Sequence, residues 1–98
     1  MAATFKLITI ICEPILSQSL IELTRKIGAT GFTLTEVRGE GTGEKSSGEI
    51  PENKIKVEIV STSALASEII REVSETFFKN YSLIIYSADI SVLRPGKF

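Results

Sequence analysis

The order of hydrophobic and polar residues along the chain predicts four β-strands. Residues 5–12 are apolar on both faces and rich in β-branched side chains, which is typical of a buried strand. Residues 32–37 and 54–60 alternate apolar and polar side chains, the pattern of strands with one buried face. Residues 83–90 form another largely apolar run, so we expect a fourth strand there.

Two further stretches carry apolar side chains at the three- to four-residue spacing of an amphipathic helix. The first spans about 14–27, with Pro14 suited to its first turn and Gly28 to its end. The second begins near Thr62 or Ser63, either of which can cap it. The inward stripes are Leu16, Leu20, Leu23 and Ile27 in the first helix and Leu65, Ile69, Ile70, Val73 and Phe77 in the second.

The predicted elements follow one another as β-α-β-β-α-β. Two βαβ units with right-handed crossovers give a four-stranded antiparallel sheet with both helices on one face. We therefore expect an α+β protein with the ferredoxin-like fold, formed as a single domain over residues 1–98.

In this fold the fourth strand lies at an edge of the sheet, yet it is apolar on both faces. Leu83 and Ile85 point to one face, and Ile84 and Tyr86 point to the other. An apolar edge strand promotes aggregation unless another surface covers it. The first strand is also apolar on the face turned away from the helices. We expect both surfaces to be covered in a closed homo-oligomer.

The composition excludes several kinds of chemistry. The chain has no histidine and one cysteine, Cys12, so it has neither a histidine base nor a metal motif of paired cysteines. Cys12 lies in an apolar strand, where a thiol is inert. The carboxylates fall on helix faces and in loops, without a pair enclosed by apolar residues. We therefore expect no catalytic residues, no metal site and no enzyme activity.

Charge and hydropathy exclude further classes of protein. The formal net charge of −1 argues against a nucleic-acid binder, which would carry a basic patch. No run approaches the roughly 20 apolar residues of a membrane span. The apolar run at 7–12 is too short for a signal peptide. We expect a soluble, cytoplasmic protein.

Residues 38–48 contain four of the seven glycines and no apolar residue. In a small domain such a loop is either functional or an ordinary hairpin connection, and the pattern alone leaves both open. A functional loop of this kind would hold an anion, because successive glycine N–H groups form a nest for its oxygens. Arg38 and Lys45 can offset phosphate charge and Thr42 can donate a hydroxyl, whereas Glu40 opposes an anion.

Other proteins with this order of elements fit less well. An RNA-recognition motif requires stacking aromatic residues on its central strands, and residues 54–60 have none. A copper chaperone requires paired cysteines, and an acylphosphatase requires an arginine after the first strand, where Glu13 and Pro14 stand. Amino-acid-binding ACT domains stay open as an alternative, although they lack a long loop between the second and third strands.

Several segments together resemble the PII-like signalling proteins, specifically the SbtB type associated with the cyanobacterial sodium-dependent bicarbonate transporter. The resemblance covers nearly the whole chain. It depends on order and spacing together, since no single segment is diagnostic. The matching segments are residues 28–33, 38–42, 46–48, 53–58, 77–81, 84–86 and 92–98.

The resemblance implies a homotrimer that binds adenine nucleotides (AMP, cyclic AMP, ADP or ATP) in its intersubunit clefts, as regulatory ligands rather than cofactors. It implies that residues 39–53 form the T-loop, which contacts a membrane transporter of the bicarbonate type. The protein would then associate peripherally with the membrane through that transporter. The implied nucleotide-binding residues are Thr35, Arg38, Gly39, Glu40, Gly41, Thr42, Lys45 and Tyr86.

The chain differs from close relatives of this type within the loop. Glu40 stands where they carry a basic residue, and Gly43 stands where one of their T-loop arginines lies. Two other functions therefore stay as alternatives to a nucleotide sensor. One is an interaction module that regulates a partner through the T-loop without nucleotide. The other is a weak nucleotide hydrolase.

Overall fold

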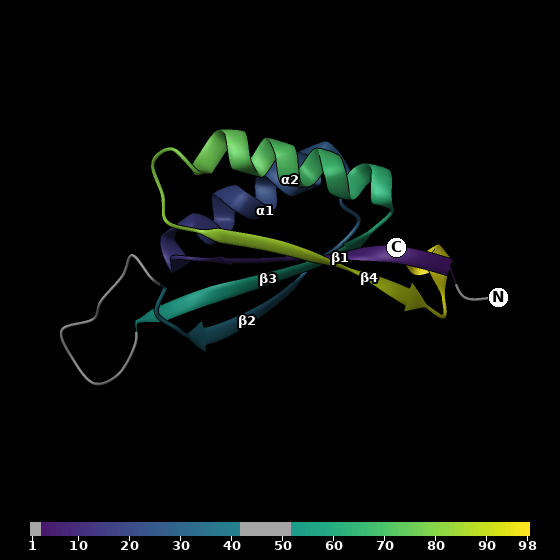
Figure 1. Cartoon of the computed structure of the whole chain (residues 1–98), viewed down its shortest axis with the longest axis horizontal. Coiled ribbons are helices and arrows are strands. Elements are labelled where there is room, and N and C mark those ends of the chain that lie inside the picture. Colours follow the sequence, from purple (N-terminus) through teal and green to yellow (C-terminus); the bar gives the residue numbers. More distant parts are fainter. Residues whose placement is uncertain (1–2, 42–51) are drawn as a thin grey trace.

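The structure, a computed structural model, describes residues 3–41 and 52–98, and its elements follow the predicted order (Figure 1). The strands are β1 (Ala3–Cys12), β2 (Thr33–Arg38), β3 (Asn53–Ser61) and β4 (Ile84–Val92). The helices are α1 (Ser17–Ile27) and α2 (Ser63–Phe77). Two short 3-10 turns, η1 (Pro14–Leu16) and η2 (Pro95–Lys97), precede α1 and follow β4.

The four strands form one antiparallel sheet in the order β2-β3-β1-β4. Central strand β1 pairs with β3 on one side and β4 on the other, so that Ile8 lies opposite Ile59 and Ser87. Both helices cover the same face of the sheet (Figure 1). The predicted ferredoxin-like fold is therefore confirmed, with β4 at an edge. We call the covered side the helix face and the other side the open face.

The core lies between the two helices and the helix face of the sheet. Ile8 and Ile10 of β1 and Val57 and Ile59 of β3 are completely buried. Both predicted helix stripes are confirmed, because their members are buried in this cluster or packed against it. The members contributed by the helices and the residues next to them include Leu16, Leu20, Ala66, Ile69, Val73, Phe77 and Leu83.

The helix α1 begins one turn later than the sequence predicts. Pro14 starts the 3-10 turn η1 instead, and the α-helix begins at Ser17. Gly28 ends α1 as predicted, with a backbone φ of 131°. Its N–H donates to the carbonyl oxygens of Thr24 and Arg25 at 3.2 and 3.1 Å. Side chains other than hydrogen disfavour this φ, so glycine is required here.

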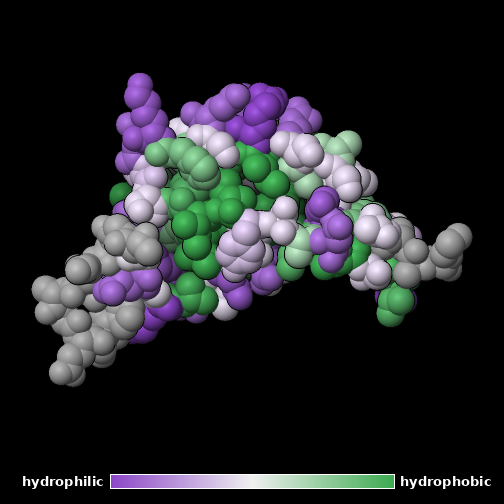
Figure 2. All heavy atoms as spheres, in the orientation of Figure 1, coloured by the Kyte–Doolittle hydropathy of each residue, from purple (hydrophilic) through white to green (hydrophobic). Residues whose placement is uncertain are grey.

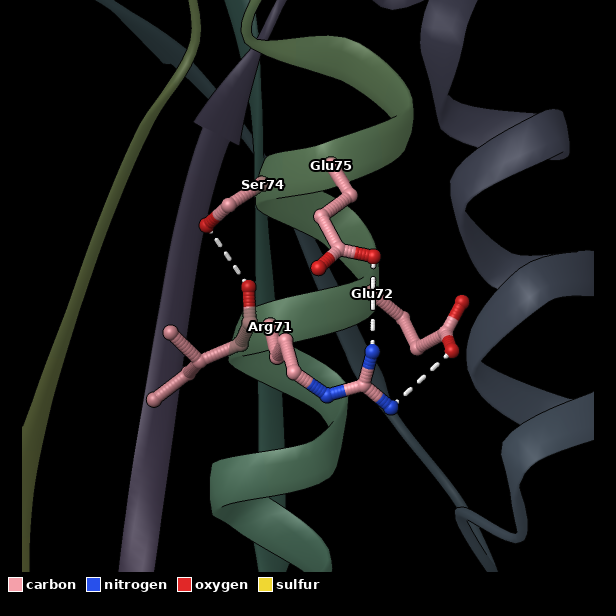
Figure 3. Close-up of polar contacts among 5 residues, drawn as sticks. Arg71, Glu72, Ser74 and Glu75 are labelled. Carbon is pink, nitrogen blue, oxygen red and sulfur yellow. Dashed lines mark hydrogen bonds and ion pairs between the residues drawn. The ribbon is translucent and has the colours of Figure 1, made fainter.

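The helix α2 begins at the predicted cap and carries charges on its outer side. The Thr62 hydroxyl accepts a hydrogen bond from the Leu65 N–H at 3.3 Å. On the surface, Arg71 pairs with Glu75 at 3.3 Å and with Glu72 at 3.2 Å (Figure 3). Exposed pairs of this kind add little stability. Within residues 3–41 and 52–98, neither helix is long and apolar enough to cross a membrane.

Large apolar side chains stay exposed along β4 and at the end of α2. Ile84 and Tyr86 are 55% and 52% exposed on the open face, while Ile85 packs against the core. Phe78, just after α2, is 50% exposed. Figure 2 shows apolar side chains gathered below α2 and along this edge of the sheet. The two-sided apolar character predicted for the edge strand is therefore confirmed, and this edge lacks a cover within the described chain.

Candidate functional site

The strands β2 and β3 are paired at the base of the glycine-rich loop that connects them. The strands β2 and β3 stay paired up to Arg38, which lies opposite Asn53. Beyond this pair, the Gly39 N–H donates a hydrogen bond to the Glu52 carbonyl oxygen at 3.3 Å. Gly39 is therefore held by a backbone hydrogen bond, and residues 40 and 41 follow directly on it.

Gly39, Glu40 and Gly41 line a small hollow on the open face, which we call the loop-base hollow. Its volume is about 180 Å³, and its other walls are Ile11, Lys54, Ser82 and Ile84. A Cβ added at Gly39 would meet no atom within 4 Å, so the space beside this glycine is open to a ligand. The hollow combines an apolar floor with peptide groups and one cation, as small-molecule sites do.

Arg38 lies in a second and larger hollow, on the helix face of the same end of the sheet. This hollow measures about 710 Å³ and is also lined by Pro14, Glu36, Val37, Asn53, Lys54 and Ile55. Arg38 therefore does not share the loop-base hollow with the three residues that follow it. Lys54 is the residue that the two hollows have in common.

Lys54 is a cation of the loop base that the sequence analysis did not single out. It lies opposite Val37 near the start of β3, and only 4% of its surface is exposed. In the sequence it falls on the polar side of an alternating strand, which is typical of a solvent-exposed lysine. Arg38 pairs with Asn53, and this register places the next residue, Lys54, beside the glycines of the loop.

Thr35 and Tyr86 lie on the open face but at opposite edges of the sheet. Thr35 is opposite Lys56 in β2, and Tyr86 is opposite Thr9 in β4. Strands β3 and β1 lie between them. Three strand spacings amount to about 14 Å, so one chain does not bring these two side chains into one site. Tyr86 is nevertheless two residues beyond Ile84, which forms part of the loop-base hollow.

The other predicted site residues differ in what the structure says of them. Thr42 and Lys45 lie outside the described residues. Glu40 lies in the loop-base hollow itself, so a carboxylate and the Lys54 ammonium share this space. An anion entering the hollow would meet both charges.

Cys12 is buried on the helix face, as expected for an inert thiol. Burial raises the pKa of this thiol, and the nearby Glu13 carboxylate raises it further, while the Lys54 ammonium lowers it. A raised pKa keeps the sulfur protonated and unreactive near neutral pH. Among the described residues, no group of three or more histidine, cysteine, aspartate or glutamate side chains is placed to hold a metal ion.

The family of the chain is decided by a match over almost its whole length. The family model of the nitrogen regulatory protein P-II matches residues 5–97. The chain belongs to the P-II family. The matched residues include both helices and all or part of every strand.

Solved structures of P-II-like proteins agree with this assignment. A protein of Thermus thermophilus, assigned to the PII-like signalling proteins, is 30% identical to this chain with a TM-score of 0.83. The alignment covers 99% of this chain and 97% of that protein. CPII of Thiomonas intermedia K12, bound to ADP and bicarbonate, is 24% identical with a TM-score of 0.84, over 100% of this chain and 97% of CPII.

A more distant neighbour extends the likeness of the fold. A DUF3240 family protein of Shewanella baltica OS155 is 17% identical with a TM-score of 0.69, over 90% of this chain and 91% of that protein. Another structure of CPII, a nitrogen regulatory PII-like protein, holds ADP, AMP and bicarbonate. At their level of identity, CPII and the DUF3240 protein share the fold with this chain.

Proposed function

We propose that this chain is a non-enzymatic regulatory protein of the SbtB type. It senses an adenine nucleotide in the intersubunit clefts of a homotrimer and acts through residues 39–53 on a membrane transporter of the bicarbonate type. The observation that carries the proposal is the loop-base hollow, where the backbone of residues 39–41, two of them glycines, lies beside the buried cation Lys54. A ligand bound there contacts the base of the loop, so it can change the conformation in which the loop binds a partner.

The chemistry of the hollow suits the phosphate end of a nucleotide. Lys54 supplies a charge-assisted interaction, and open space beside Gly39 lets a phosphate approach the backbone closely. Ile11 and Ile84 supply apolar contact. At about 180 Å³ the hollow is smaller than the roughly 300–1,000 Å³ of typical small-molecule sites. One chain therefore provides only part of a nucleotide site.

A second copy of the chain supplies the missing part in this proposal. Edge strand β4 of one copy lies beside edge strand β2 of the next, which places Tyr86 of the first near Thr35 of the second. The same contact covers the exposed side chains of Ile84 and Tyr86. Because β2 and β4 are different surfaces, such contacts run head to tail and must close into a ring. A closed ring of copies, three in this proposal, leaves no edge strand unpaired.

The relatives support the choice of ligand. Structures of CPII hold ADP, AMP and bicarbonate. We propose an adenine nucleotide as the ligand of this chain for two reasons. CPII and this chain are both PII-like proteins, and the hollow offers a cation and glycine backbone at the loop base. The bicarbonate in CPII supports the proposed link to inorganic carbon.

Calorimetric titration with AMP, cyclic AMP, ADP and ATP tests the proposal. We expect saturable binding of at least one of them, with one site per chain, and trimers in sedimentation. Gly39→Ala should weaken that binding without loss of folding, because its Cβ has free space in the chain but stands where the ligand approaches. Trimers that bind none of the four at millimolar concentration would remove the nucleotide from the proposal. Release of phosphate from ATP would support the hydrolase instead.

One observation favours the interaction module as a second candidate. Glu40 places a carboxylate in the loop-base hollow, where it repels phosphate. A protein that had lost the nucleotide but kept the loop for a partner would tolerate this residue. The two candidates separate in the same titration, since only the nucleotide sensor binds a ligand.

A further inference from the structure

Two connections of the chain lie at the same end of the molecule as the base of the loop. Strand β1 ends there, because Cys12 lies opposite Ile55 near the start of β3, and η1 follows it. The connection from α2 to β4 reaches the same end, because Ile84 lies opposite Ile11. Figure 1 shows η1 and this connection beside the end of β2 and the start of β3. We call this part of the molecule the loop end.

Each of these two connections exposes one large apolar side chain. In η1, Leu16 is buried, whereas Ile15 next to it is 82% exposed. At the end of α2, Phe77 is buried, whereas the adjacent Phe78 is 50% exposed. Leu16 and Phe77 belong to one core cluster, so the same core fixes both connections. The fold buries one member of each pair and leaves the other on the surface.

Ile15 and Phe78 lie away from the edges at which copies meet in the proposed ring. That ring places β4 of one copy beside β2 of the next. Ile15 instead follows the central strand β1, and Phe78 ends the helix layer. In the described part of the chain, the other exposed large apolar side chains lie on β2 or β4, just before β4, or after it: Leu34, Ile84, Tyr86, Tyr81, Leu93 and Phe98. Contact between copies therefore accounts for those residues but not for Ile15 and Phe78.

The loop by itself offers a small surface to a protein partner. A stable protein interface buries roughly 800 Å² on each side and involves about 20–30 residues of each partner. Residues 39–53 number only fifteen. A partner that binds them needs further surface, and the loop end adjoins them directly. Pro14, next to Ile15, lines the hollow that contains Arg38, and Ser82 lines the loop-base hollow.

The composition of the loop end suits a protein partner better than a lipid surface. Exposed Lys79 and Asn80 follow Phe78, so polar side chains flank an aromatic one. Apolar and aromatic centres with a polar rim are typical of protein interfaces, and aromatic residues often dominate their binding energy. An anionic membrane attracts clusters of cations. The two connections carry one cation, Lys79, and one carboxylate, Glu13, so they have no excess of positive charge.

We propose that Ile15 and Phe78 anchor a second contact surface, which docks on the same membrane protein that the loop engages. The chemistry that fits them is an apolar hollow of that protein with a polar rim. The inference rests on the proposed function and adds a contact made by the body of the protein to the one made by the loop. Neither residue lines a hollow at the loop base, so the contact is separate from the nucleotide site.

Photo-crosslinking in membranes of the cells that produce the protein tests the second surface. p-Benzoylphenylalanine replaces Phe78, Ser47 of the loop, or exposed Glu68 of α2 in three otherwise intact proteins. The crosslinkers at 78 and 47 should label the same membrane polypeptide, and the one at 68 should label none. Ile15→Ser should raise the protein concentration for half-maximal labelling from position 47 by about 10- to 100-fold, the effect of losing one buried apolar side chain. Glu68→Ser is the control and should leave that concentration unchanged.

Nucleotide titration and sedimentation show whether Ile15→Ser acts on the partner alone, since both should match the wild type. Labelling from 47 without labelling from 78, labelling of two different polypeptides, or an unchanged concentration in Ile15→Ser would overturn the second surface and leave the role of the loop intact. Phe78 replaced by the crosslinker and linked to phospholipid, or to a second copy of the chain, would also overturn it. No labelling from either position would remove the membrane partner itself, and both proposals would fail.

Discussion

Replacing Lys54 by methionine should weaken nucleotide binding strongly while leaving the fold intact. Lys54 is 4% exposed and lines both hollows at the loop base. Methionine retains an unbranched stem of similar length and removes the charge together with the N–H donors of the ammonium. A charge pair at about 4 Å is worth roughly 4 kcal/mol at an effective dielectric constant of 20. Desolvation offsets much of this, and charge-assisted hydrogen bonds contribute about 1.5–3 kcal/mol net. We therefore expect a loss of about 10- to 100-fold in affinity for AMP and ADP.

Lys56→Met is the matched control for this prediction. Lys56 lies on the same strand and the same face, opposite Thr35, and lines neither hollow at the loop base. Its charge lies beside Thr35 rather than at the loop base, where the phosphate is proposed to bind, so its loss should cost about threefold or less at physiological salt. Titration calorimetry gives both affinities, and thermal melting confirms that both variants are folded.

Two outcomes would refute the reasoning. Equal losses in the two variants would mean that the net charge of the face, rather than contact with Lys54, governs binding. An unchanged affinity in Lys54→Met would place the phosphate away from the loop base.

Four further predictions concern single residues. Gly39→Ala should reduce nucleotide affinity at least tenfold with little change in melting temperature, because its added methyl group meets only the ligand; equal affinity would show that no ligand approaches this backbone. Gly28→Ala should destabilise the protein by about 1–2 kcal/mol and lower its melting temperature by several degrees, since its φ of 131° strains other residues; an unchanged melting curve would contradict this. Glu40→Lys should tighten AMP and ADP binding by roughly tenfold at low salt and by less at high salt; an affinity independent of the substitution would mean that Glu40 faces away from the ligand. The raised pKa of Cys12 favours the folded state below the ordinary thiol pKa, and this contribution is lost as pH rises toward the folded-state value. Denaturant titrations should therefore show a free energy of unfolding that falls above about pH 8.5 in the wild type and falls less in Cys12→Ala. Parallel pH profiles in the two proteins would exclude Cys12 as the cause of the fall.

The fold could be predicted from the sequence because its periodic signals agree with one another. Alternation in β3 placed Val57 and Ile59 in the core, and the helical stripes of α1 and α2 proved to be buried. The start of α1 was less accurate, because a proline at the first turn suits a 3-10 turn as well as an α-helix. Pro14 occupies such a turn.

The site could be predicted only in part, for a physical reason. The glycines of the loop indicate that a ligand can approach the backbone closely, and three residues of the loop do line a hollow. Period-two alternation assigns a side chain to a face but says nothing of how the neighbouring strands bury it, so Lys54 was missed. Thr35 and Tyr86 lie at opposite edges of one sheet. The apolar edge strand indicates that copies associate, but a single sequence does not show which residues of two copies meet.

The most direct measurement is the structure of the protein crystallised with saturating AMP or ADP. The account predicts a trimer with the nucleotide between copies, its phosphate within hydrogen-bonding distance of Lys54 and the backbone of residues 39–41. It also predicts Tyr86 of the adjoining copy in the same cleft as Thr35. A nucleotide bound elsewhere, or trimers whose loop-base hollows stay empty at saturating ligand, would contradict the account.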